Sequence, residues 1–183
     1  MKIVTIPHPA LKKVAKPVSN IDKRVVRLIR EMEETLDRQR NPEGVGLSAP
    51  QVNVNQRIFI IKNPEDRKLQ VFINPEFTAM EYSKTASSAG AAHGEMKDGI
   101  ESMEGCLSIP GIWANVRRYD KVKLTFQDLN GAYHEEEYTG FMSIVVQHEY
   151  DHLNGILFTE RALEQGNPLY KEVNGKLREI SFL

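Results

Sequence analysis

The sequence of 183 residues is poor in cysteine, in unbalanced charge and in long apolar runs. Cys106 is its only cysteine, which excludes an intramolecular disulfide and a secreted scaffold stapled by disulfides. The 24 basic and 25 acidic side chains nearly cancel, so nothing in the charge predicts binding to nucleic acid or to an anionic membrane. No stretch approaches the ~20 apolar residues of a membrane-spanning helix, and the N-terminus lacks a signal peptide's apolar core. We expect a soluble protein in the reducing cytoplasm.

The overall composition is that of an ordinary globular protein, with 40% hydrophobic and 27% charged residues. A chain of this length fits one compact domain rather than two. It contains no internal repeat and no linker-like segment that would divide it. We therefore expect a single domain over residues 1–183.

Hydrophobic periodicity predicts two helices. The first covers about residues 20–40, with Ser19 and Asp22 as its start signal and the segment 41–44 ending it. The second covers about residues 140–154, with Gly155 as a C-terminal cap residue. The apolar residues 156–158 that follow are expected to form a short strand.

Strand patterns predict two hairpins. Residues 57–61 and 69–73 pair across a turn at 63–66, and residues 121–127 and 133–138 pair across an Asn-Gly turn. The small, polar segment 83–99 is predicted to be a surface loop. The tail, residues 176–183, fits either a further strand or a last turn.

The second helix contains the pattern H-E-x-x-H, formed by His148, Glu149 and His152. Histidines four residues apart lie on one face of a helix, where both imidazoles can bind one metal ion. Glu149 lies beside the first ligand, where it can act as general base and then general acid on a metal-bound water. The alternative is a helix with two surface histidines and no metal. The apolar residues before the motif instead predict a buried helix, in which the two histidines and Glu149 need partners.

A catalytic site of this type needs a third protein ligand and an open coordination position. The third histidine of metzincins is missing, because Phe158 stands in its place. Glu172, downstream, would give a thermolysin-like site, whereas Cys106, upstream, would give a softer one suited to Zn, Fe(II), Co or Ni. Spacing and softness favour Cys106, and the Glu172 alternative stays open at this point.

Three segments in this order resemble the signature motifs of peptide deformylases. They are G-V-G-L-S-A-P-Q at 44–51, E-G-C-L-S at 104–108 and Q-H-E-Y-D-H-L-N-G at 147–155. The resemblance covers nearly the whole chain, and it implies an α+β fold in which antiparallel sheets pack around a central metal-binding helix. It also implies the activity: a metal-dependent hydrolase that removes the N-formyl group from formylmethionine at the start of nascent polypeptides and releases formate.

The resemblance implies a role for each matching residue. Cys106, His148 and His152 would hold one divalent metal, Fe(II) in the cell, with Zn, Ni or Co able to replace it. Glu149 would be the acid/base residue, and the Gln51 amide and the Leu107 backbone N–H would stabilise the developing oxyanion. The substrate would contact the following residues: Val45, Gly46, Gly105, Phe141, Ile144 and Val145.

The implied partners are formylmethionyl nascent peptides, with the ribosome as a further candidate, and neither nucleic acid nor a membrane is expected to be recognised directly. We expect a monomer in the bacterial cytoplasm, an organelle being the less favoured location. Asp151, three residues after His148, is predicted to pair with Arg118 or Arg117 and so to tie the helix to the Cys106 segment.

Overall fold

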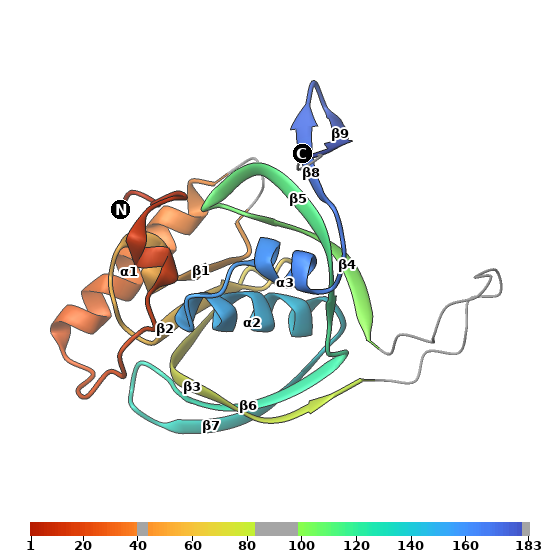
Figure 1. Ribbon diagram of the computed structural model, residues 1–183. Helices are drawn as coiled ribbons and strands as arrows, with labels where there is room; N and C mark the ends of the chain where they lie inside the picture. Colours follow the sequence, from red (N-terminus) through yellow and green to blue (C-terminus); the bar gives the residue numbers. More distant parts are fainter. Residues whose placement is uncertain (40–43, 83–98, 181–183) are drawn as a thin grey trace.

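Two antiparallel sheets enclose one central helix, α2 (Gly140–Leu153), in the computed structural model, which describes residues 1–39, 44–82 and 99–180 (Figure 1). Helix α2 contacts strands of both sheets. It is buried on nearly all sides, its buried residues running from Ser143 to Leu153 with few gaps. The predicted α+β class and the helix predicted at 140–154 are confirmed, and Gly155 follows the helix with a φ of 69°.

The larger sheet has five strands in the order β1-β2-β3-β6-β7. Their bounds are Gly46–Ser48, Ile58–Lys62, Leu69–Glu81, Lys121–Gln127 and Tyr133–Thr139. Both predicted hairpins are confirmed as β2–β3 and β6–β7. Strand β3 runs eight residues beyond the predicted end because its register shifts between Ile73 and Glu76, and its second half then pairs with β6.

The smaller sheet has four strands in the order β4-β5-β8-β9. Their bounds are Ile100–Cys106, Ile109–Arg118, Leu169–Val173 and Lys176–Glu179. The sequence predicted no strand for β4, β5 or β8. It allowed a strand in the tail, and β9 confirms that choice over residues 176–179.

The first helix, α1, spans Lys23–Asp37, a shorter range than the predicted 20–40. Asp22 is its N-cap, since its carboxylate accepts hydrogen bonds from the backbone N–H of Arg24 and Val25. Ser19 as a start signal was wrong. The inner face of α1 packs on β1 and β2.

A third helix, α3, spans Phe158–Glu164, so the strand predicted at 156–158 was wrong. Glu160 explains the difference, because its side chain accepts a hydrogen bond from the Leu157 backbone N–H and so caps the helix start. Phe158 and Ala162 are buried against β5 and β8, which accounts for the apolar run. Two short 3₁₀ helices, η1 (Pro9–Lys12) and η2 (Ala49–Val52), complete the fold.

The predicted surface loop at 83–99 lies, except for Gly99, outside the described residues, as do residues 41–43 and the last three residues of the tail. Within the described ranges, no helix is both long enough and apolar enough to cross a membrane.

The close contact between Gly155, just after α2, and Lys12, the last residue of η1, can be tested by mutation. A Cβ on Gly155 would lie 2.7 Å from the Lys12 carbonyl oxygen, whereas a Cβ on Gly166, at a similar φ of 75°, would meet no atom within 4 Å. Both Gly→Ala changes strain the backbone, at about 1–2 kcal/mol each. Gly155→Ala adds overpacking, and we expect it to lower the free energy of unfolding by about 1–3 kcal/mol more than Gly166→Ala in urea titrations. Equal losses would contradict this packing.

Candidate metal centre

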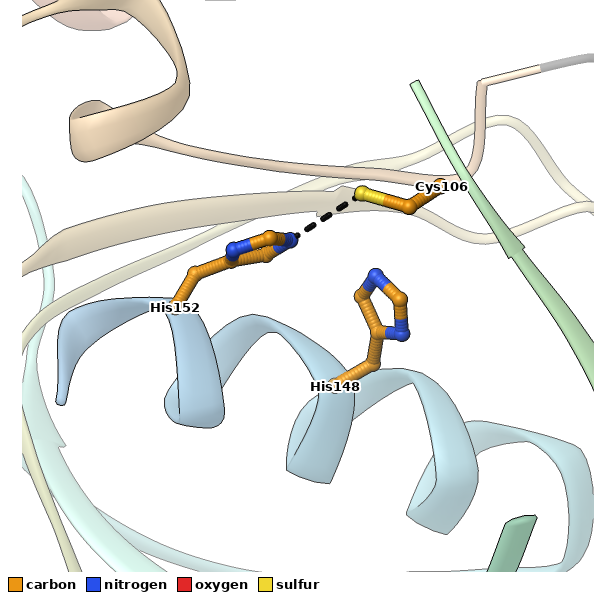
Figure 2. Close-up of side chains that lie close together, drawn as sticks. All are labelled: Cys106, His148 and His152. Atoms are coloured by element: carbon orange, nitrogen blue, oxygen red, sulfur yellow. Dashed lines mark hydrogen bonds between the residues drawn. The ribbon is translucent and has the colours of Figure 1, made fainter. Parts of the chain in front are cut away.

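Three candidate metal ligands meet where strand β4 ends above helix α2. Cys106 is the last residue of β4, and His148 and His152 lie four residues apart on α2. One donor atom of each residue lies within 4.8 Å of the other two, and Cys106 Sγ is 3.2 Å from His152 Nε2. Figure 2 shows both imidazoles rising from α2 on the side that faces Cys106.

The charge state of this cluster suits a divalent cation. Burial raises the pKa of the Cys106 thiol, but the charge of His152 and hydrogen bonds with both imidazoles outweigh it and hold that pKa well below its ordinary value. These contacts therefore favour the thiolate form of the sulfur. One thiolate and two imidazoles form a soft donor set that fits Fe(II), Zn, Co or Ni better than Mg or Ca. The residues present thus fit a bound metal ion.

Glu104 fixes the orientation of His148. The His148 Nδ1–H donates a hydrogen bond of 2.8 Å to Glu104 Oε2, and the other ring nitrogen is left facing Cys106 (Figure 2). No role was predicted for Glu104 from the sequence, where it is the first residue of the motif at 104–108. Its position two residues before Cys106 was an available signal, because residues i and i+2 of a strand share one face.

Arg118 joins the two elements that carry the ligands. Its guanidinium donates to both oxygens of Glu104, at 2.8 and 3.0 Å, and to Asp151 Oδ2 at 2.6 Å. The predicted pairing of Asp151 with Arg118 is confirmed, and Arg161 binds the same carboxylate from the outer side. Burial raises the pKa of Glu104, but the Arg118 charge and the hydrogen bonds from His148 and Arg118 lower it to about 2. Burial likewise raises the pKa of Asp151, but the hydrogen bond from Arg161 and the charge of Arg118 outweigh it and lower that pKa, so both carboxylates stay charged at neutral pH.

Glu149 is a buried carboxyl beside this cluster. Its Oε2 has no hydrogen-bond partner within residues 1–39, 44–82 and 99–180. Burial raises its pKa to about 7, and the charges of His148 and His152 oppose that rise only in part. The carboxyl lies so close to Gly46 that a Cβ at that position would collide with it. A carboxyl with this pKa can both accept and donate a proton near neutral pH.

Gln51 reaches the cluster from η2. The Ser48 backbone N–H and hydroxyl donate to Gln51 Oε1 at 2.8 and 2.9 Å. With its oxygen held there, the amide points its nitrogen at Cys106, and Nε2 lies 3.5 Å from Sγ. Leu107 follows Cys106 in the turn to β5. An amide N–H and a backbone N–H therefore lie beside the candidate ligand.

A cleft of about 220 Å³ opens onto this cluster. Its lining includes Gln51, Leu107, Glu149, Cys106 and His148, together with every predicted substrate contact: Val45, Gly46, Gly105, Phe141, Ile144 and Val145. Strands β1 and β4, which flank it, are edge strands of their sheets. His152 lies below the lining and is 1% exposed.

Glu172 does not join the cluster. It lies on β8, where its carboxylate accepts a hydrogen bond of 3.3 Å from the Trp113 indole. The thermolysin-like alternative, which needs Glu172 as third ligand, therefore finds no support.

A soft three-donor cluster, a buried carboxyl of raised pKa and an open cleft together define a metal-dependent hydrolase. The family model for polypeptide deformylase matches residues 1–167. The peptide deformylase of Wolinella succinogenes is 38% identical over 167 residues, covering 88% of this chain and 87% of that protein. That of Pseudomonas aeruginosa is 38% identical over 161 residues, covering 87% and 85%. The crystal structure of Thermotoga maritima peptide deformylase matches with a TM-score of 0.74 at 34% identity, covering 87% of this chain and 95% of that one.

The chain belongs to the polypeptide deformylase family. It is a metal-dependent enzyme that removes the formyl group from formylated nascent peptides, as its resemblance in sequence implied.

The buried ion pairs of Arg118 with Glu104 and Asp151 can be tested by mutation. Arg118→Met would leave two buried carboxylates, Glu104 and Asp151, without their shared cation. We expect a loss of about 3–5 kcal/mol in the free energy of unfolding, the usual cost of breaking a buried ion pair. Arg161→Met is the matched control: its side chain is 36% exposed against 5% for Arg118, so we expect a loss of about 1 kcal/mol or less. Similar losses for both variants in chemical denaturation would refute the central role of Arg118.

Proposed function

We propose that Cys106, His148 and His152 hold the metal ion of this deformylase. The convergence of their donor atoms within 4.8 Å carries the proposal, since two sequence segments far apart supply them. A divalent cation held by these three residues would supply Lewis acidity for the formyl carbonyl and would lower the pKa of water toward neutrality.

Glu149 acts as general base and then general acid. It takes a proton from the attacking water and delivers it to the amide nitrogen that leaves as the new N-terminus. Its pKa of about 7 and its unpartnered oxygen support this role, because the carboxylate is available to accept and is readily protonated in turn.

Gln51 and Leu107 stabilise the oxyanion that forms as water adds to the formyl carbonyl. The Gln51 Nε2–H and the Leu107 backbone N–H are the two donors. Such donors work best when they are held in place before the reaction, and losing one costs about 10²–10³ in rate. The two bonds from Ser48 that fix the Gln51 amide support this assignment.

The substrate chain binds as an added strand between the free edges of β1 and β4. Backbone groups of Val45, Gly46 and Gly105 pair with it. The methionine side chain enters the apolar part of the cleft, lined by Phe141, Ile144 and Val145.

We infer that the metal in the cell is Fe(II). Zn, Ni or Co could replace it, because the donor set accepts all four. The chain works as a monomer, and residues 1–183 form one catalytic domain. It acts in the bacterial cytoplasm on chains emerging from the ribosome, and the bacterial origin of the Wolinella and Pseudomonas relatives supports that location.

Two substitutions separate metal binding from proton transfer. We expect Cys106→Ser to lose most of the bound metal and with it formate release from formyl-Met-Ala-Ser. Glu149→Ala should keep the metal and lose at least ~10²-fold in kcat, the usual share of a general acid–base residue. Metal content by elemental analysis and formate release are measured on the same samples.

Glu172→Ala is the control for the ligand set, and it should keep a full complement of metal. Metal retained in Cys106→Ser but lost in Glu172→Ala would overturn the ligand assignment. A metal-replete wild-type protein that releases no formate would overturn the proposed function itself.

The identity of the metal has its own test. A thiolate-bound Fe(II) is open to oxidation at the metal and at the sulfur. We expect protein loaded with Fe(II) to lose activity during incubation in air, while the Ni(II)-loaded form keeps it. Anaerobic incubation of the Fe(II) form is the control, and full activity of that form after aerobic incubation would contradict thiolate ligation.

A further inference from the structure

A second cavity lies against a different face of helix α2 from the active-site cleft. Its α2 residues are Gln147, Tyr150, Asp151 and Asn154, which share one face of the helix through their spacing of three and four. Among the residues that the structure describes, none lines both cavities. The second cavity has a volume of about 340 Å³ against about 220 Å³ for the cleft, which is enough for a small molecule.

Aromatic rings form much of the wall of this cavity. The Tyr82 and Tyr119 rings stack with their centroids 4.1 Å apart, so the residue after β3 contacts the residue after β5. The Phe77 and Tyr150 centroids lie 4.4 Å apart and join β3 to α2. All four rings line the cavity. Such a wall favours a flat ring, which can pack on it face to face or edge to face.

Three arginines line the cavity, and two of them are paired within the fold. Arg161 donates to both oxygens of Asp151, at 2.8 and 3.1 Å. Arg118 donates to Asp151 and to Glu104. Two guanidiniums thus face two carboxylates, and their charges balance.

Arg117 is the third arginine, and its charge is not balanced in this way. Its partner in the β4–β5 ladder is Glu101, but no ion pair joins Arg117 to a carboxylate of the described residues. Gly99, at a φ of 118°, lets the chain pass close beside Arg117 and Tyr82. A Cβ on Gly99 would lie 2.9 Å from Tyr82 Cδ1 and 3.0 Å from Arg117 Cγ. The described lining therefore has one positive charge in excess, next to an aromatic ring.

The Tyr82 hydroxyl lies within the field of two of these arginines. Burial and the neighbouring Tyr119 raise the pKa of Tyr82, and the charges of Arg117 and Arg161 oppose that rise. An anionic group beside this hydroxyl would be attracted by both guanidiniums. Arginine is well suited to such a group, because its planar fork binds carboxylate and phosphate oxygens in pairs.

We propose that this cavity is a binding site for a small aromatic anion: the aryl group packs on the wall formed by Tyr82 and Tyr119, and its carboxylate or phosphate binds Arg117. The site goes beyond the proposed function, because none of the residues assigned to metal binding, proton transfer or substrate contact lines it.

The experiment titrates the metal-loaded wild-type enzyme with 2-naphthoate and with 2-naphthyl phosphate by calorimetry. We expect a Kd of about 1 mM or tighter for at least one of them, the range that ligands of about 13 non-hydrogen atoms reach in a good site. The better of the two probes identifies the preferred anion. 2-Naphthylmethanol, the neutral counterpart of the carboxylate, should bind at least about tenfold more weakly than the better anion, because it forms no charge-assisted pair with Arg117.

Three variants test the residues of the site. Arg117→Met should weaken binding of the better anion by at least about tenfold and leave that of the neutral probe unchanged. Tyr82→Ala should weaken both by about 2–10-fold through loss of an aromatic contact. Arg178→Met, which removes an exposed arginine of β9 outside the cavity, is the matched control and should bind both probes as wild type does. Melting temperatures check that each variant is folded.

The kinetics of formate release from formyl-Met-Ala-Ser show which cavity the probe occupies, since an anion could also bind a metal ion in the cleft. A probe in the second cavity should leave KM unchanged, whereas a purely competitive rise in KM would place it in the cleft and overturn the proposal.

Two binding results would overturn the proposal as well: no binding of either anion by the wild type, or full affinity in Arg117→Met. These binding measurements need no turnover. A failure of the proposed function, seen as a metal-loaded enzyme that releases no formate, is therefore distinct from a failure of this site.

Discussion

Arg118 makes it possible to bury a charged site around helix α2. The helix carries Asp151 into the interior, and β4 carries Glu104, so two carboxylates lie away from water. One guanidinium binds both, which removes the cost of unpaired buried charge and joins the smaller sheet to the central helix. Glu104 in turn aligns His148. The orientation of the His148 imidazole therefore depends on the ion pair between Glu104 and Arg118.

The arrangement of the sheets explains why the cleft lies where it does. Strands β1 and β4 belong to different sheets, and each is an edge of its own. Their edges face the same end of α2, where Glu149 packs against Gly46 and Cys106 meets the histidines. Edge strands usually need protection against pairing with other chains. Here the exposed edges flank an active-site cleft, which suits a substrate that is itself an extended chain.

Sequence patterns within a short segment correctly predicted the helices and hairpins that such a segment forms by itself. The helix at 140–154 has a continuous apolar stretch, and the β6–β7 hairpin has its Asn-Gly turn. Strands β4 and β5 were not predicted because buried charges at Glu104 and Arg118 and a glycine at 105 interrupt the expected alternation of apolar and polar residues. Each interruption has a structural reason, since the Arg118–Glu104 pair aligns His148 and Gly105 leaves room for the Trp113 ring. Helix α3 was missed for another reason: its start depends on the Glu160 side chain, and its apolar residues pack on strands not yet assigned.

The candidate site was predictable as a set of residue types but not as a geometry. The spacing of His148 and His152 and the softness of sulfur pointed to the cluster, whereas Glu172 had a plausible spacing and lies elsewhere. The Glu104 hydrogen bond and the Ser48 contacts to Gln51 depend on chain segments meeting in space. Periodicity carries no information about such meetings.

A cation held by Cys106 and His152 would join positions 46 residues apart in the sequence. It would act as a cross-link between β4 and α2, and it would close a long loop only when both are folded. Part of its binding energy would then count toward the stability of the folded chain. Metal supply and the lifetime of the folded protein would be coupled, so a cell that runs short of the ion would lose the protein as well as its activity.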